Sequence, residues 1–129
     1  MNQLLTKSMT VSDLASASRV NASAVRFYDK HGLIAGERTS GNQRRFSEED
    51  ACRIKVIRVA QRVGLSVSEI SELLIDLPSK PSSAEWASVG AKLRAAAQER
   101  IDQLNHALDD LTGPVQLCDV SNAVDSPEA

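Results

Sequence analysis

The sequence is poor in aromatic side chains, which make up 3% of its 129 residues. A core built largely without them must rely on alanine, valine, leucine and isoleucine, and this favours packed helices over a β-sandwich. No stretch approaches the roughly 18 uninterrupted apolar residues of a membrane-spanning helix. The first residues also lack the apolar region of a secretory signal. We therefore expect a cytoplasmic, mainly α-helical protein that does not contact a membrane.

Cysteine and histidine are scarce as well. The two cysteines, Cys52 and Cys118, are too far apart in the sequence to suggest a disulfide framework, and there are only two histidines. The sequence has no Ser-His-Asp order, no phosphate-binding loop and no metal-ligand pair. These absences argue against an enzyme, and we expect neither a metal site nor a cofactor.

Charge is unevenly distributed along the chain. Residues 1–65 carry eleven basic and six acidic side chains, whereas residues 66–129 carry four basic and eleven acidic ones. A basic half joined to an acidic half suggests that the first half binds a polyanion such as nucleic acid. A chance asymmetry on a solvated surface is the alternative at this point.

Two short helices joined by a tight turn are predicted first. Thr10 and Asp13 form a pattern like a capping box, and Asn21 caps a second helix that runs to about His31. Two helices joined by three or four residues are typical of a helix-turn-helix. Arg19 stands where such a turn usually has glycine. Either Arg19 adopts the left-handed conformation at a small cost or the turn differs.

A small hairpin, or wing, is predicted next. Two short extended pieces flank the turn signal Ser40-Gly41-Asn42. The arms of this wing carry three arginines: Arg38, Arg44 and Arg45.

Two more helices follow the wing. Ser47 caps the third helix, whose first turn is acidic, and Ser66 with Glu69 forms a capping box on the fourth. The apolar face of the fourth helix continues to Leu77, and Pro78 ends it.

A long helix is predicted from Ala84 to about Leu111. Its apolar seam advances in steps of three and four residues, with an extra four-residue insertion after Ala97. The seam consists of Trp86, Gly90, Leu93, Ala97, Ile101, Leu104, Leu108 and Leu111. Such a helix is roughly 40 Å long, too long for this small chain to cover, so we expect it to pair with a second copy. The alternative is that it folds back on its own domain.

These elements predict four parts of the chain. They are a winged helix-turn-helix domain at 8–77, a linker at 78–83, a dimerisation helix at 84–112, and a sensor-like segment with a mobile tail at 113–129.

The second helix carries the best candidates for contacts with DNA. Ser23, Arg26 and Lys30 are spaced so that they share one face. Arginine can bind guanine or phosphate, and a serine near a helix N-terminus can reach either a base edge or a phosphate oxygen. We expect Val25 and Phe27 to turn inward. For Tyr28 the alternative is a packed aromatic, and for Arg26 a surface salt bridge with Asp29.

Three blocks of sequence then carry a family resemblance. They are Val11-Ser12-Asp13-Leu14-Ala15, Arg26-Phe27-Tyr28-Asp29-Lys30-His31-Gly32-Leu33-Ile34 and Gly41-Asn42-Gln43-Arg44-Arg45-Phe46. The chain resembles the MerR family of transcriptional regulators over roughly residues 8–113, and it is most similar to the redox-sensing SoxR branch. The resemblance implies DNA contacts by Ser23, Arg26 and Tyr28 on the second helix and by Arg44 and Arg45 on the wing, with Lys30 and Arg38 as further candidates.

The resemblance also implies a mechanism. Members of the family form antiparallel coiled-coil homodimers on pseudo-palindromic promoters whose spacer is too long. An inducer lets the dimer bend and undertwist the spacer, so that RNA polymerase engages both promoter elements without the regulator having to contact it. This is a readout of DNA deformation.

The chain departs from the SoxR branch in its cysteines. An iron–sulfur cluster needs four thiolate-type ligands, and an ungapped match puts Pro114, Leu117, Asp119 and Asp125 at those positions. Cys118 is the only cysteine in that stretch, so the cluster cannot form in this way. The inducer could instead be a thiol-reactive species or a small ligand.

Three residues are candidates for sensing such an inducer. Cys118 is the first, and we expect Cys52 to be a small buried apolar residue unless it approaches Cys118 of the other subunit. Trp86 could line a ligand pocket in the dimer cleft, although it could also simply pack at the interface. A constitutive repressor or architectural dimer without an effector stays open as an alternative. A pure coiled-coil interaction module would not need the arginine-rich wing.

Overall fold

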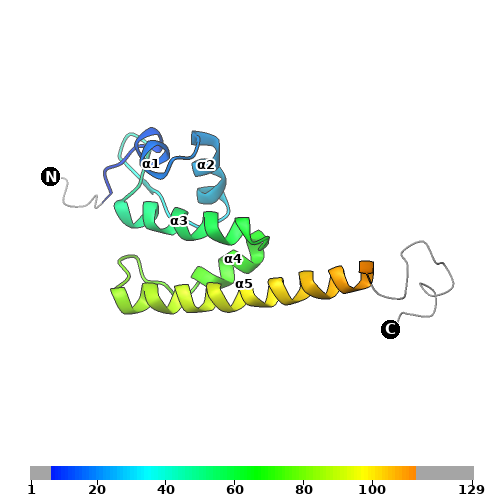
Figure 1. Cartoon of the computed structure of the whole chain (residues 1–129). Helices are drawn as coiled ribbons and strands as arrows, with labels where there is room; N and C mark the ends of the chain where they lie inside the picture. Colours follow the sequence, from blue (N-terminus) through cyan, green and yellow to red (C-terminus); the bar gives the residue numbers. More distant parts are fainter. Residues whose placement is uncertain (1–6, 113–129) are drawn as a thin grey trace. The chain divides into compact units, whose positions relative to one another are not determined.

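The computed structural model of the chain describes residues 7–112. The elements follow in the order α1 (Val11–Ser18), α2 (Ala22–Lys30), β1 (Glu37–Arg38), β2 (Arg44–Arg45), α3 (Glu48–Arg62), α4 (Val67–Leu74) and α5 (Ser83–Thr112). Helix α1 packs against both α2 and α3 (Figure 1). The architecture is therefore mainly helical with a two-stranded wing, as the sequence predicts. None of these described helices is long and apolar enough to cross a membrane.

The described residues form two compact units. The first extends to Leu93 and contains the predicted winged helix-turn-helix together with the beginning of α5. The second starts at Arg94 and contains the rest of that helix. Residues 113–129, which include Cys118 and the predicted sensor-like segment, lie outside the described residues.

The predicted helix starts are confirmed by their hydrogen bonds. Thr10 Oγ1 accepts from Asp13 N at 3.0 Å, and Asp13 Oδ2 accepts from Thr10 N at 3.1 Å. Ser66 and Glu69 make the same reciprocal pair on α4, with distances of 2.7 and 3.1 Å. Asn21 Oδ1 accepts from Ala24 N at 2.8 Å. Each cap satisfies backbone N–H groups that the first turn leaves without a helical partner.

The turn between α1 and α2 is made without glycine. Arg19 adopts the left-handed conformation, with φ 58° and ψ 43°. For a residue with a side chain this conformation costs about 1 kcal/mol. The turn is held by hydrogen bonds from Arg19 N to Ser16 O and from Val20 N to Ala15 O. The first of the two alternatives for Arg19 is therefore confirmed.

The core of the first unit is aliphatic with two aromatic members. Its buried apolar residues are Leu14, Ala15, Val25, Tyr28, Leu33, Ile34, Phe46, Ile54, Ile57, Ala60, Ile70, Leu73, Leu74 and Val89. Helix α4 ends at Leu74, short of the predicted Leu77, and Leu77 packs against the core from the following segment.

The long helix confirms its predicted extent and corrects its seam. Ser82 and Glu85 form a capping box just ahead of it, which sequence analysis missed. Val89, absent from the predicted seam, is the buried residue of α5 and joins the core of the first unit, with Leu93 packed against that core. The beginning of the helix thus packs on its own domain. Beyond it, four seam residues are half exposed: Ile101, Leu104, Leu108 and Leu111.

The wing is a two-stranded antiparallel hairpin. Glu37 pairs with Arg45 and Arg38 with Arg44. Asn42 in the turn has φ +64°, and Thr39 Oγ1 accepts from the backbone N–H groups of Gly41 and Gln43 at 3.1 and 3.2 Å.

The base of the wing is continued by a β-bridge between Met9 and Phe46. This bridge ties the hairpin to the segment that precedes α1. The predicted hairpin is confirmed, including its turn.

Candidate nucleic-acid interface

The polar face predicted on α2 is present and exposed. Ser23, Arg26 and Lys30 are all solvent-accessible. Ser23 Oγ donates to Asn21 Oδ1 at 2.8 Å, so the cap of the helix also orients this hydroxyl. Two cations and a hydroxyl on one exposed helical face suit a phosphate backbone and base edges.

Phe27 also belongs to the exposed surface of α2. Val25 is buried as expected, but Phe27 is 40% exposed, so the expectation that it turns inward is wrong. Its ring lies against His31, with centroids 4.3 Å apart, and meets Tyr28 edge-on at 6.0 Å. The first unit closes its core with Val25 and Tyr28, which leaves an apolar ring outside, next to Arg26.

Tyr28 is a packed aromatic. It is 5% exposed, and its hydroxyl donates to Gln61 Oε1 of α3 at 3.1 Å. The alternative of a packed aromatic is therefore the one that the structure shows for the Tyr28 ring.

Two wing arginines are held along the hairpin by neutral acceptors. Arg38 Nη1 donates to Asn42 Oδ1 at 3.0 Å. Arg45 donates from Nη2 to Gln43 Oε1 and from Nη1 to Arg44 O, both at 3.0 Å. Because these acceptors carry no charge, these hydrogen bonds do not neutralise either guanidinium group.

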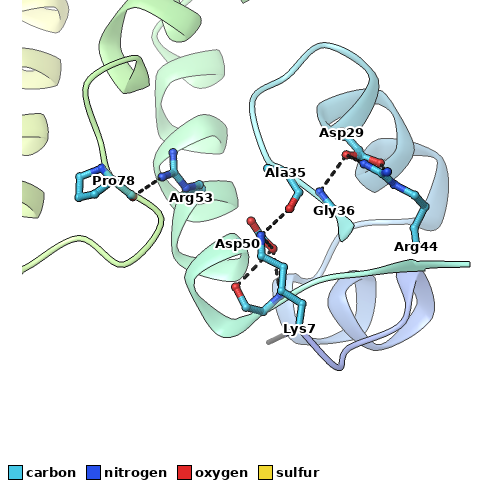
Figure 2. Close-up of polar contacts among 9 residues, drawn as sticks. Lys7, Asp29, Ala35, Gly36, Arg44, Asp50, Arg53 and Pro78 are labelled. Atoms are coloured by element: carbon cyan, nitrogen blue, oxygen red, sulfur yellow. Dashed lines mark hydrogen bonds and ion pairs between the residues drawn. The ribbon is translucent and has the colours of Figure 1, made fainter. Parts of the chain in front are cut away.

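Arg44 has a different environment. Its Nε and Nη2 donate to the two carboxylate oxygens of Asp29 at 2.9 and 2.7 Å (Figure 2). Hydrogen bonding to Asp29 raises the pKa of Arg44, and partial burial opposes this effect. Asp29 thus pairs with Arg44, not with Arg26 as in the alternative considered for Arg26. The Arg44 guanidinium is engaged by this carboxylate, although the Arg44 side chain keeps 32% of its accessible surface.

A basic hollow lies beside the start of α2. Arg58 of α3 donates from Nη1 to Arg19 O at 2.9 Å, which brings both arginines together. The hollow is lined by Arg19, Val20, Asn21, Ala24, Tyr28, Arg58 and Gln61. Sequence analysis did not select Arg58, because nothing in its neighbourhood on α3 distinguishes it from other surface cations.

The candidate sensor residues are only partly described. Cys52 is exposed on α3, so the expectation that it is buried is wrong. Trp86 is partly buried, and Cys118 lies outside the described residues. Residues 7–112 contain no group of three His, Cys, Asp or Glu side chains that could hold a metal ion. With Cys52 as their one thiol, they do not fit an iron–sulfur cluster, which needs four ligands.

The comparisons with known proteins agree with this geometry. A family model for MerR HTH family regulatory proteins matches residues 9–76, and a model described as MerR, DNA binding matches residues 52–113. A SoxR homolog from Chromobacterium violaceum, an HTH-type transcriptional activator, is 39% identical over 105 residues. The match covers 80% of this chain and 71% of that protein.

Two further relatives extend the comparison. A mercuric resistance operon regulatory protein from Shigella flexneri is 39% identical over 69 residues, and the match spans about half of each chain, 53% of this one and 48% of the other. The crystal structure of HiNmlR, a MerR family regulator lacking the sensor domain and bound to promoter DNA, superposes with a TM-score of 0.52 at 25% identity. The superposition covers 81% of this chain and 84% of the HiNmlR chain.

The winged helix-turn-helix, the exposed basic face of α2 and the two family matches lead to one conclusion. The chain belongs to the MerR family of DNA-binding transcriptional regulators and is similar to its SoxR-like members.

Proposed function

We propose that this regulator works in the cytoplasm as a homodimer on a pseudo-palindromic promoter. Each copy places α2 in the major groove and its wing on the adjacent phosphates. The observation that carries the proposal is a polar and basic set on α2 and the wing, in which Ser23, Arg26, Lys30 and Arg38 are exposed and Arg45 is partly exposed.

The second half of α5 supports the pairing of two copies. Ile101, Leu104, Leu108 and Leu111 follow one another in steps of three, four and three residues and are 49–59% exposed. A helical stripe of large apolar side chains is stabilised by a partner helix that removes it from water. A second copy of the same chain presents the same stripe, so residues 84–112 form the proposed dimerisation helix.

The proposed consequence of DNA binding is a change in promoter shape. A dimer that holds two half-sites at a fixed separation can bend and undertwist the spacer between them. RNA polymerase then responds to the altered spacer rather than to a surface of the regulator. The solved structure with promoter DNA is of a similar protein, and it supports the docking of this fold on duplex DNA.

The proposed inducer is a thiol-reactive species at Cys118 or a small ligand in the dimer cleft near Trp86. The exposure of Cys52 makes a second thiol accessible to such a species. A dimer that binds DNA constitutively is the alternative. Footprinting with and without diamide tests the thiol-reactive inducer, because a thiol sensor changes its spacer pattern with diamide, whereas a constitutive dimer or one induced by a small ligand does not.

A gel-shift titration over salt tests the DNA-binding proposal directly. The probe is a duplex that the protein selects from a randomised pool, and the control is a scrambled duplex of equal length. We expect tighter binding to the selected duplex and a steep loss of affinity as salt rises, since phosphate contacts release counterions. Equal, salt-independent binding to both duplexes would contradict the proposal.

A further inference from the structure

Asp29 lies on α2, the helix proposed to enter the major groove, and its carboxylate forms hydrogen bonds within the protein. Asp29 Oδ1 accepts from Arg44 Nη2 at 2.7 Å and from Gly36 N at 3.1 Å, while Oδ2 accepts from Arg44 Nε at 2.9 Å (Figure 2). Arg44 belongs to β2, and Gly36 directly precedes β1. One carboxylate thus joins the recognition helix to both strands of the wing.

The close approach at this point requires glycine. A Cβ atom on Gly36 would lie 2.8 Å from Phe46 Cε1 and 2.9 Å from Arg44 Nε, both shorter than real contacts allow. Only the bare backbone lets the Arg44 side chain pass over residue 36 and reach Asp29. The local sequence is therefore suited to this junction as well as to the hairpin itself.

The same loop is held from its other side. Lys7 Nζ donates to Ala35 O and forms an ion pair with Asp50 at 3.2 Å, and Asp50 is 2% exposed (Figure 2). Asp50 also accepts from Ser47 N at 2.9 Å. The wing itself has only two residues in each strand, too few to hold an orientation alone. Its direction must therefore come from these anchors together with the Met9–Phe46 bridge, and Asp29 is the anchor that leads to α2.

We propose that Asp29 is a positioning residue for DNA recognition and that Arg44 acts through it rather than as a phosphate contact. The pair sets the wing at the distance from α2 at which Arg38 and Arg45 meet phosphates while Arg26 enters the groove. This inference rests on the proposed DNA-binding function. It adds Asp29, whose negative charge would be repelled by DNA phosphates, to the residues on which recognition depends.

Electrostatics alone and positioning predict opposite results for Asp29→Asn. Removal of a negative charge from a DNA-facing surface strengthens binding when the charge has no other role. Loss of a two-point, charge-assisted hydrogen bond releases the wing and weakens binding. Whether Asp29→Asn strengthens or weakens DNA binding therefore decides between a purely electrostatic role and a positioning role.

The experiment compares full-length wild type and Asp29→Asn on the selected and scrambled duplexes. We expect Asp29→Asn to bind the selected duplex roughly tenfold more weakly, the loss typical of one charged hydrogen bond. Affinity for the scrambled duplex should change much less. Glu48→Gln, which removes the same charge from an exposed residue in the first turn of α3, is the matched control and should bind no more weakly than wild type. Unchanged or tighter binding of Asp29→Asn to the selected duplex would overturn the proposal.

Thermal unfolding and a second set of variants separate positioning from general instability. If Asp29→Asn unfolds, Arg44→Lys takes its place, because it keeps the charge and loses the two-point geometry. We expect Arg44→Lys to lose the preference for the selected duplex at an unchanged melting temperature. Wild-type behaviour of Arg44→Lys would mark Arg44 as a simple phosphate cation and overturn the proposal.

The exchanged pair, Asp29→Arg with Arg44→Asp, should recover part of the preference, and no recovery relative to Asp29→Arg alone would count against a direct partnership. A wild-type protein that selects no duplex would instead refute the proposed function itself.

Discussion

Leu104→Ala should weaken the association of two copies about thirty-fold. Leu104 is 59% exposed on the second half of α5. Burial of a whole leucine side chain contributes about 2 kcal/mol, so burial of the exposed part against a partner contributes about 1 kcal/mol. A symmetric dimer carries the substitution twice, which gives about 2 kcal/mol. At 1.4 kcal/mol for each factor of ten, this corresponds to about thirty-fold in the dissociation constant.

Sedimentation velocity over a concentration series measures this constant at fixed salt. Gln103→Ala is the matched control, because residue 103 lies about 100° around the helix from Leu104. Leucine and alanine are both strong helix formers, so circular dichroism of the dissociated Leu104→Ala chain should still show a helical protein. Equal dissociation constants for wild type and Leu104→Ala would show that this stripe does not face a partner, and the reasoning from its exposure would then be refuted.

Three other predictions concern separate parts of the chain. Arg45→Ala should weaken binding to all duplexes alike and lower the slope of log affinity against log salt by about one, because one phosphate contact is lost. A gel-shift salt titration measures both, and unchanged affinity would remove Arg45 from the interface. Asp50→Ala should lower the free energy of unfolding by about 2 kcal/mol, since it removes the carboxylate that bonds Lys7 and Ser47 N. Urea unfolding tests this, and a stability equal to wild type would show that the ion pair contributes nothing. Cys118→Ser should abolish any effect of diamide on DNA binding if that thiol is the sensor, with Cys52→Ser as the control. A response that survives in both variants would show that neither thiol by itself is the sensor.

The parts of the fold that depend on neighbours in sequence were predictable. The caps at Thr10 and Ser66 each join residues three apart, and the turn residues of the wing are contiguous. Their hydrogen bonds form within one turn of chain, so residue type and spacing suffice to predict them. The exposed positions of Ser23, Arg26 and Lys30 follow from helical periodicity in the same way.

Features set by tertiary packing were not predictable. Asp29 has Arg26 three residues away, a spacing that favours a helical ion pair, yet it bonds to Arg44, which is fifteen residues distant. The exposure of Phe27, by contrast, follows from periodicity, since residues 25 and 27 lie about 200° apart around a helix and Val25 is buried. The same holds for Cys52, which lies about 160° around α3 from the buried Ile54 and is exposed.

The mass and affinity of the complex with duplex DNA test the central claim most directly. Sedimentation equilibrium of the full chain with a selected duplex gives the number of chains bound, and a salt series gives the electrostatic part of the affinity. Two chains should bind each selected duplex, with affinity that falls steeply as salt rises. One chain on each duplex, or the same affinity for the selected and the scrambled duplex, would contradict it.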